Sequence, residues 1–370
     1  MEAIAVVSKG LEETAAKEIK ELIKSDAHIS DLCVKFNFKK YEQLCELCYK
    51  AQSVDRIVLL LHSFASKNIL EDFKKYMENA DFSKWLKRKK FRVECQRTGN
   101  HGFRSVDVEE LGAKIIAKKF SSVPDYKNPD IFIFVYIVGD KCSIGIDFSG
   151  FELNKRPYKI FLNSSSLRGT IAYALVRESG FEKKEVLLDP FAKDGMVAIE
   201  AAMWRCNMPI SYYKKEKFAF LKLDLGIDTE KFFKKIDKKI SRKETEIFCY
   251  DSTFKNIDSC KKNAKIAGIE KEIKFSRTEL ERLDLKFSKK SVDRIVTFPI
   301  TLKGPIIEKI YNEFFYQAEY ILKDSGTVAI ATQFPEQIMK HAEKHSFRLN
   351  TKKEVWSGEQ NIFLMAFSKK

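Results

Sequence analysis

The chain has 370 residues, 44% of them hydrophobic and 32% charged, which is typical of a soluble globular protein of two or three domains. No run of about 18 apolar residues occurs and residues 1–7 lack the basic start of a signal peptide, so we expect a cytoplasmic protein without a membrane partner. The net charge of +15 favours a polyanionic partner such as nucleic acid, because neutralised phosphates release counterions. A lysine-rich proteome, or a charge that serves solubility alone, is the alternative.

The first 65 residues alternate between strand and helix patterns. Residues 3–7 are apolar and predict a strand, and an amphipathic helix follows. Residues 33–38 alternate as a second strand, residues 41–51 are helical, and residues 53–62 are rich in valine, isoleucine and leucine. This order predicts an α+β module of ferredoxin-like topology.

Eight cysteines are scattered along the chain, and two of them form the CxxC pair Cys45 and Cys48. This pair lies on a helical pattern and has no partner pair, so we expect buried apolar thiols rather than a zinc or redox site. Dispersed thiols suit a reducing compartment, and no metal is expected.

The next block continues the alternation. A helix at 69–77 precedes a strand at 91–95, and a polar loop then enters a helix at 106–120, followed by strands at 130–138 and 142–149. The order and its motif residues are similar to the THUMP domain of RNA-modifying enzymes; those residues are Arg97, Gly99, His101, Phe103, Ser105, Pro129, Asp130, Gly145 and Asp147.

By this resemblance the THUMP domain grips the acceptor end of tRNA, and basic residues around its loop are candidate RNA contacts. The alternative is a solvated basic face. The candidates are Lys84, Lys87, Arg88, Lys89, Lys90, Arg97, His101 and Arg104. Further along, residues 211–245 are lysine-rich and predict an insertion with one basic amphipathic helix.

Two strand ends carry acidic residues in the C-terminal half. An apolar run at 186–188 ends in Asp189 and Pro190, makes a short turn and enters a helix, the unit with which open α/β sheets bind nucleotide-like ligands. A second strand, 247–251, ends in Asp251. An acid at the end of the second strand binds ribose hydroxyls in doubly wound folds; a helix N-cap is the alternative role.

The first of these turns resembles the Asp-Pro-Phe-x-Gly-x-Gly cofactor motif of S-adenosylmethionine (SAM)-dependent RNA methyltransferases, with Lys193 where the family has its first glycine. The text of residues 263–268 resembles the family's Asn-Ala-x-x-Ala-Gly. The resemblance implies SAM as cofactor. The residues implied to bind it are Asp189, Phe191, Gly195, Asp251 and, for the adenine ring, Glu279, for which a solvated turn residue is an equal alternative.

The family's acceptor motif, Asn-Pro-Pro-Tyr, falls on residues 297–301 after the strand at 292–296. In the family the carboxamide and the following carbonyl accept hydrogen bonds from the target amine, and the aromatic ring stacks on the base. Here Pro299 matches the proline, while the asparagine position falls on Thr297 or Phe298 and the aromatic position on Ile300 or Thr301. Phe298 as the stacking ring, with Thr297 or a backbone carbonyl as acceptor, is the substitute arrangement.

The resemblance spans the whole chain and divides it into a ferredoxin-like module (1–65), a THUMP domain (66–150), a linker (151–165) and an α/β doubly wound class I methyltransferase domain (166–370). The chain is similar to the archaeal-type tRNA guanine-N2 methyltransferases, and this resemblance implies tRNA as partner and methylation of a flipped guanine. We expect a monomer. Two alternatives remain: a catalytically silent relative that binds tRNA or a partner enzyme, and an RNA binder that uses another small ligand.

Overall fold

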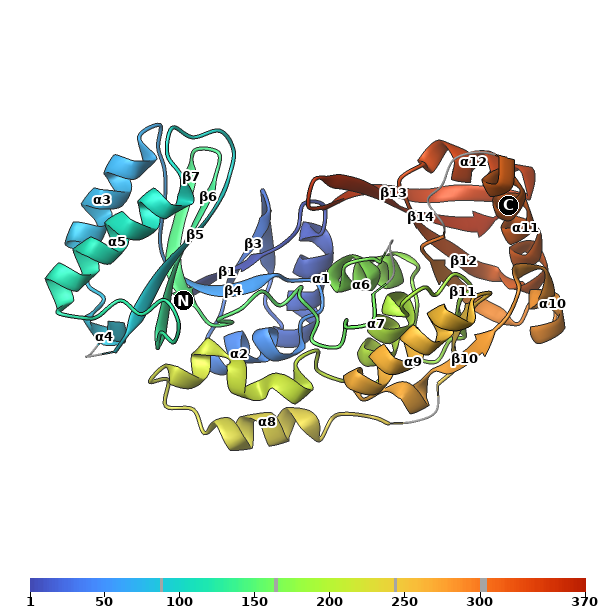
Figure 1. Ribbon diagram of the computed structural model, residues 1–370, viewed down its shortest axis with the longest axis horizontal. Coiled ribbons are helices and arrows are strands. Elements are labelled where there is room, and N and C mark those ends of the chain that lie inside the picture. The colour runs from blue at the N-terminus through green and yellow to red at the C-terminus, as the bar shows by residue number, and fades with distance from the viewer. Residues whose placement is uncertain (87–88, 163–165, 243–244, 300–304) are drawn as a thin grey trace. The chain divides into compact units, whose positions relative to one another are not determined.

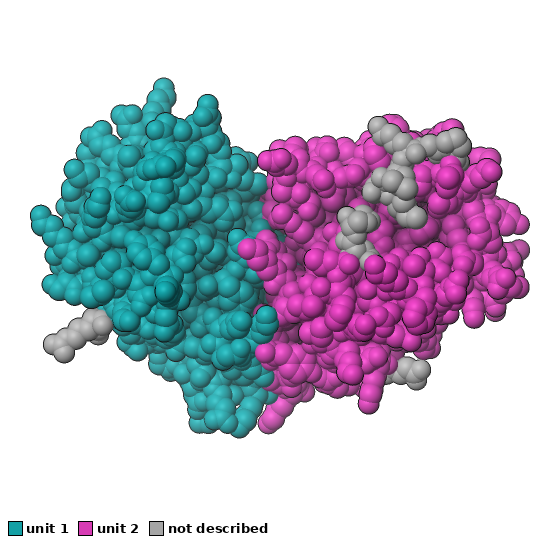
Figure 2. Space-filling model, in the orientation of Figure 1, with its two compact units in different colours: residues 1–7, 15–153, 214–235 teal, residues 8–14, 154–213, 236–370 magenta. Residues whose placement is uncertain are grey.

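The computed structural model describes residues 1–370 apart from 87–88, 163–165, 243–244 and 300–304 (Figure 1). The chain forms two compact units, coloured separately in Figure 2. Unit 1 comprises Met1–Val7, Ala15–Leu153 and Lys214–Lys235, and unit 2 comprises Ser8–Thr14, Asn154–Tyr213 and Ile236–Lys370. Both units are therefore assembled from separate stretches of sequence.

Unit 1 is built on a seven-stranded sheet with the order β2-β3-β1-β4-β7-β6-β5. Its N-terminal part pairs strands antiparallel in the order that a ferredoxin-like βαββαβ chain produces. The elements are β1 (Glu2–Val6), α1 (Glu12–Ile23), β2 (Ala27–Ser30), β3 (Cys33–Asn37), α2 (Tyr41–Lys50) and β4 (Arg56–Ala65).

The rest of the unit 1 sheet continues from β4, which pairs antiparallel with β7. β5 runs parallel to β6, and α3 and α5 lie together on one face of these strands (Figure 1). The elements are α3 (Ile69–Asn79), α4 (Ser83–Leu86), β5 (Phe91–Thr98), α5 (Ser105–Phe120), β6 (Ile131–Val138) and β7 (Lys141–Asp147). The two modules thus share one continuous sheet.

The lysine-rich segment of the C-terminal half contributes aromatic side chains to the core of unit 1. It contains the predicted amphipathic helix, α8 (Thr229–Asp237), and two short 3-10 turns, Tyr212–Lys217 and Ala219–Lys222. The ring of Phe233 lies 4.9 Å from that of Tyr49 in α2, and the Phe218 ring stacks 4.9 Å from that of Phe220. Burying these rings fixes the segment against the N-terminal module.

Unit 2 is built on a second seven-stranded sheet with the order β10-β9-β8-β11-β12-β14-β13. Its first five strands are parallel and β14 pairs antiparallel with both β12 and β13. The strands are β8 (Leu187–Asp189), β9 (Ile247–Asp251), β10 (Lys274–Arg277), β11 (Val292–Thr297), β12 (Leu322–Thr332), β13 (Phe347–Ser357) and β14 (Gln360–Lys369).

Helices cover both faces of this sheet, α6, α7 and α9 on one and α10, α11 and α12 on the other (Figure 1). They are α6 (Gly169–Glu178), α7 (Met196–Arg205), α9 (Phe254–Ala267), α10 (Leu283–Lys286), α11 (Pro305–Ile321) and α12 (Pro335–Lys344). From β8 the chain adds β9 and β10 on one side and then crosses to β11 on the other. This is the switch point at which doubly wound sheets bind ligands, and the predicted fold class is confirmed.

A buried ion pair ties the segment before α6 to α7. Arg156 donates from Nε to Glu200 Oε1 at 2.7 Å and from Nη2 to Oε2 at 3.2 Å, and the Tyr158 hydroxyl donates to Oε1 at 2.6 Å. A Cβ at Gly169 would lie 2.5 Å from Glu200 Oε1, so only glycine fits at the start of α6. The cluster holds α7, the helix that begins directly after the predicted cofactor motif.

No helix in the described parts of the chain is long and apolar enough to cross a membrane. All eight cysteines are buried with free thiols, and burial raises the pKa of the Cys95 and Cys142 thiols to about 12. Such thiols remain protonated near neutral pH.

Candidate active site

The loop after β8 carries two residues in the left-handed region. Lys193 has φ +54° and Gly195 has φ +83°, the latter as the N-cap of α7. A Cβ at Gly195 would lie 3.1 Å from Cys260 Cβ and 3.2 Å from its Cα, so glycine also permits α9 to approach the loop. Gly195 shapes the turn and does not line the neighbouring cavity.

A cavity of about 360 Å³ opens at the carboxyl ends of β8, β9 and β10. It contains three of the predicted cofactor residues, Phe191, Asp251 and Glu279. Its wall also includes Lys193, Pro190, Ser252, Thr253, Asn256, Thr278, Leu280, Glu281, Lys309, Ile310 and Glu313. Four apolar residues stand among ten polar or charged ones in this wall, which suits a ligand that combines an apolar ring with many hydrogen-bonding groups.

Asp251 is a buried acid of this cavity whose carboxylate accepts three hydrogen bonds. It is 6% exposed; Oδ1 accepts from Thr253 N and Asn256 Nδ2, both at 2.9 Å, and Oδ2 accepts from Lys193 N at 3.1 Å. Each carboxylate oxygen has two lone pairs, so acceptor capacity remains for hydroxyl groups in the cavity. Three donors fix the carboxylate at the end of β9 in one orientation.

The opposite rim of the cavity is less constrained. Glu279 is exposed and lies 3.9 Å from Arg277 Nη2, while Thr278 is buried and donates to Ser276 Oγ at 3.0 Å. Asn256 and Glu313 were not predicted from the sequence. Asn256 follows Asp251 by five residues in the first turn of a helix, which is a usable signal, whereas α11 brings Glu313 in from a distant part of the chain.

Asp189 faces away from this cavity and towards β11. It is 1% exposed, and its Oδ1 accepts from the Thr297 hydroxyl at 2.6 Å and from Phe191 N at 3.2 Å. Burial raises the pKa of Asp189 to about 7. Thr297, a predicted catalytic residue, therefore directs its hydroxyl hydrogen to Asp189.

Lys193 reaches the other predicted acceptor residues. Its ammonium donates to the Pro299 carbonyl at 3.0 Å and lies 3.7 Å from the centroid of the Phe298 ring. Burial lowers the pKa of Lys193 to about 8. Thr297, Phe298 and Pro299 are thus adjacent to the cofactor motif, while Ile300 and Thr301 lie outside the described residues.

Asn263, from the second motif, organises the loop rather than the cavity. Its Nδ2 donates to Asp194 O at 2.9 Å and to Phe161 O at 3.0 Å, and its Oδ1 accepts from Phe161 N at 2.9 Å and Ile160 N at 3.2 Å. Four hydrogen bonds from one buried amide hold the linker segment and the motif loop on α9.

Two family models match the chain: the RMKL-like methyltransferase domain over residues 156–361 and the THUMP domain over residues 67–147. The chain belongs to the RMKL-like methyltransferase-domain family. The family resemblance inferred from the motifs is thereby confirmed, as is the predicted THUMP domain.

Relatives and solved structures match nearly the whole chain. A tRNA (guanine(6)-N2)-methyltransferase from Methanocaldococcus jannaschii is 27% identical, with 97% of each chain covered. One of the same name from Archaeoglobus fulgidus is 23% identical over 98% of this chain and 91% of its own.

Among crystal structures, TrmN from Thermus thermophilus has TM-score 0.76 and 20% identity, covering 100% of this chain and 99% of its own. SMU.472, a putative methyltransferase complexed with SAH, has TM-score 0.84 and 18% identity, covering 100% of this chain and 98% of its own. These two structures share the fold of the RMKL-like chain along its whole length.

The predicted RNA contacts of the THUMP domain fall at both ends of β5. At its start, Lys89 donates to Lys222 O at 2.6 Å and pairs with Asp224 at 3.1 Å, and Lys90 pairs with Asp125 at 3.0 Å. Lys84 donates to the Tyr41 hydroxyl at 2.9 Å. Lys87 and Arg88 lie outside the described residues. The eight residues of β5 span roughly 25 Å at about 3.3 Å each, so these lysines and the loop residues form two separate groups.

At the end of β5, His101 connects the loop to the β6–β7 turn. Its Nε2 lies 2.7 Å from Gly139 O; because a carbonyl only accepts, Nε2 carries the proton and Nδ1 accepts from Arg97 Nη1 at 3.3 Å. Arg104 is exposed and pairs with Asp107 at 3.0 Å. His101 and Arg97 therefore stabilise the loop, and Arg104 remains the most accessible of the three.

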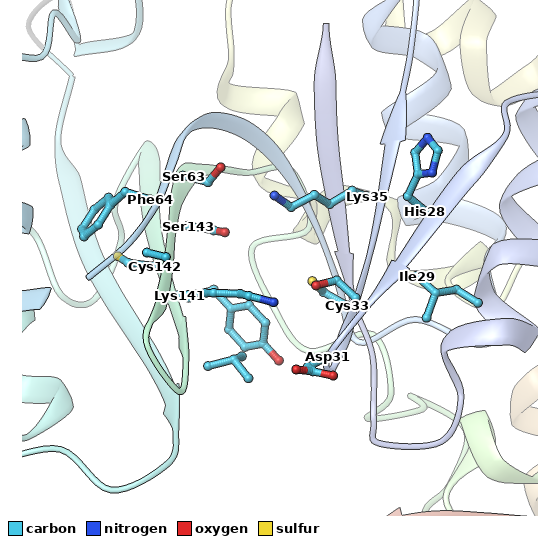
Figure 3. Close-up of a pocket in the computed structure, with 14 residues that line it drawn as sticks. His28, Ile29, Asp31, Cys33, Lys35, Ser63, Phe64, Lys141, Cys142 and Ser143 are labelled. Atoms are coloured by element: carbon cyan, nitrogen blue, oxygen red, sulfur yellow. The ribbon is translucent and has the colours of Figure 1, made fainter. Parts of the chain in front are cut away.

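Sequence reasoning missed a second cavity, of about 400 Å³, within unit 1 (Figure 3). It lies between the β2–β3 hairpin and the β6–β7 hairpin, and its floor includes Cys33 and Tyr136. Figure 3 shows the side chains of Lys35 and Lys141 extending into this space. No predicted RNA contact lines it. The cavity was not predicted because β2 was not anticipated and because the pairing of β4 with β7 is a long-range contact.

Proposed function

We propose that this chain is a SAM-dependent methyltransferase that modifies tRNA at the N2 amine of a guanine. The observation that carries the proposal is the cavity at the carboxyl ends of β8, β9 and β10, with the immobilised carboxylate of Asp251 in its wall. The names of the two archaeal relatives support the substrate, and the THUMP domain supports an RNA partner.

The residues of the cavity fit the nucleoside half of SAM. Asp251 is suited to accept from the ribose hydroxyls, Phe191 and Leu280 offer apolar walls for the purine, and Thr278 with Glu279 supplies polar groups at its edge. SAM, when bound, supplies an electrophilic methyl group. Every other requirement falls on the protein: to hold the cofactor, orient the acceptor amine and exclude water.

The acceptor side rests on Phe298 and Pro299. In the proposed role the Pro299 carbonyl accepts from the guanine amine, which directs the nitrogen lone pair, and the Phe298 ring packs on the flipped base. Burial of Phe298, which is 8% exposed, favours a dry site for the exchange. The amine proton released after transfer passes to solvent or to a nearby base.

The test is calorimetric titration with SAH, followed by transfer of labelled methyl from SAM to tRNA and mapping of the modified nucleoside. Asp251→Ala should abolish SAH binding, whereas Asp258→Ala, which removes a partly exposed acid of α9 that pairs with Lys262, should leave it unchanged. Micromolar binding in both variants would refute the assigned site. Binding without transfer to any tRNA would refute the activity.

Recognition of tRNA is tested separately by the salt dependence of binding. Arg104→Gln should reduce the slope of log K against log salt by about 1, because one phosphate contact contributes about 0.9 to this slope on a B-DNA duplex and about 0.7 on a single strand. An unchanged slope would remove Arg104 from the interface. We also propose that the protein works in the cytoplasm, as its dispersed buried thiols suit a reducing compartment.

A second candidate function, a silent relative that binds tRNA without modifying it, is favoured by one observation. The Thr297 hydroxyl is directed to Asp189 and the Pro299 carbonyl already accepts from Lys193. Tight, salt-dependent tRNA binding in the absence of SAH binding would support this function.

A further inference from the structure

The backbone of Lys193 is held on both sides, and this fixes the direction in which its side chain leaves the loop. Its N–H donates to Asp251 Oδ2 at 3.1 Å, and its carbonyl accepts from Cys260 Sγ at 3.5 Å. Because φ is +54°, a conformation that favours glycine, the residue is kept in place by its surroundings rather than by its own preference. The side chain of Lys193 therefore starts beside Asp251, at the end of β9, and leaves the loop in a fixed direction.

That direction leads to the acceptor residues. The ammonium donates a hydrogen bond to the Pro299 carbonyl at 3.0 Å and lies over the Phe298 ring, 3.7 Å from its centroid. The second distance is well within the range at which a cation and an aromatic face attract each other. Lys193 is 7% exposed. A nitrogen of the protein thus occupies the position in which the proposed function puts the nitrogen of the acceptor base.

The free space around Lys193 differs on its two sides. Among the described residues, a cavity of about 360 Å³ lies on the Asp251 side, and a space of about 10 Å³ lies between Asp189, Met196 and Phe298. A space of that size holds one water at most. In SAM the sulfur joins the nucleoside to both the amino-acid chain and the methyl group, so the cofactor needs room beyond a cavity that holds the nucleoside alone.

Lys193 lines both spaces, as Phe191 does, and its ammonium is the group that contacts the acceptor residues. We infer that Lys193 determines which ligand the cavity accepts: in this conformation it admits an adenine nucleoside and excludes the amino-acid chain of the cofactor. The cofactor and the acceptor amine enter together with withdrawal of the Lys193 side chain from Pro299. This inference rests on the proposed function, since it takes the cavity to be the SAM site.

The experiment compares the affinities of adenosine and SAH for the full-length protein and three variants by calorimetry. Lys193→Gly removes the side chain and suits the left-handed backbone. Lys193→Met keeps most of the volume but cannot donate to Pro299. Lys255→Ala removes an exposed lysine of α9 and controls for the loss of charge. Thermal unfolding of each variant verifies that it is folded.

If Lys193 excludes the amino-acid chain, Lys193→Gly should bind SAH at least about tenfold more tightly than the unaltered protein, while its adenosine affinity stays within about twofold. Lys193→Met should bind SAH with an affinity between these two, and Lys255→Ala should match the unaltered protein. Selective strengthening of SAH binding is the distinguishing result, since a merely structural residue would affect both ligands alike.

Three other outcomes overturn the inference in different ways. Equal SAH affinity with and without the Lys193 side chain would overturn it and leave the proposed cofactor standing. Weaker SAH binding by Lys193→Gly would also overturn it, because Lys193 would then be a cofactor ligand. If neither ligand binds the unaltered protein or Lys193→Gly, the proposed cofactor fails and the inference fails with it.

Discussion

Replacing Glu200 by glutamine should destabilise unit 2 severely. The carboxylate accepts two hydrogen bonds from Arg156 and one from Tyr158, and the side chains of Arg156 and Glu200 are both fully buried. Glutamine keeps the shape but removes the negative charge that faces the buried guanidinium. Removing one partner of a buried pair costs about 3–5 kcal/mol.

In a domain of about 200 residues each kcal/mol shifts Tm by roughly 2–4 °C, so the expected decrease is about 6–20 °C by scanning calorimetry. The double variant Arg156→Met with Glu200→Leu should recover most of the loss, because apolar residues of similar volume leave no buried charge. A decrease below about 2 °C for Glu200→Gln, or a double variant no more stable than the single one, would refute the reasoning.

Three further predictions follow from titratable and basic groups. Burial raises the pKa of Asp189 to about 7, so the folded protein keeps a proton on Asp189 that the unfolded chain releases above about pH 4. The free energy of unfolding should therefore fall by up to ~4 kcal/mol between about pH 4 and 7. Urea unfolding of Asp189→Asn should lack this decline. Burial lowers the pKa of Lys193 to about 8, so the attraction of its ammonium to the Phe298 ring weakens above that pH. The SAH affinity of the unaltered protein should therefore rise from pH 7 to 9 relative to that of Lys193→Gly. A ratio of these two affinities that stays constant with pH would contradict this. The double variant Lys35→Gln with Lys141→Gln should reduce the salt slope of tRNA binding by about 1.5–2, as two lost phosphate contacts require, and an unchanged slope would exclude the second cavity from the interface.

The sequence was sufficient for those features that depend on local pattern. Apolar runs ending in Asp189 and Asp251 predicted two parallel strands with acids at their carboxyl ends, and the structure has both. The amphipathic helix expected within residues 211–245 is α8. Strand β2 was missed because it is a four-residue edge strand without a buried alternating face.

Features that depend on long-range contacts were not predicted. The ion pair of Arg156 with Glu200 joins residues 44 positions apart, and nothing in either local pattern indicates the other. The substitution at Lys193 was visible, but its contact with Pro299 depends on a left-handed backbone held by Asp251. The roles of the predicted site residues in cofactor and RNA binding stay predictions until the titrations are done.

The discontinuous make-up of the two units has a consequence for synthesis on the ribosome. The chain passes between units five times, after residues 7, 14, 153, 213 and 235. Tyr49 in α2 is buried against Phe218 and Phe233, so the N-terminal module lacks part of its core until residue 235 has left the exit tunnel. A nascent chain stalled at residue 153 would expose that aromatic surface. A fragment of the protein that ends at the THUMP boundary would keep that aromatic surface exposed.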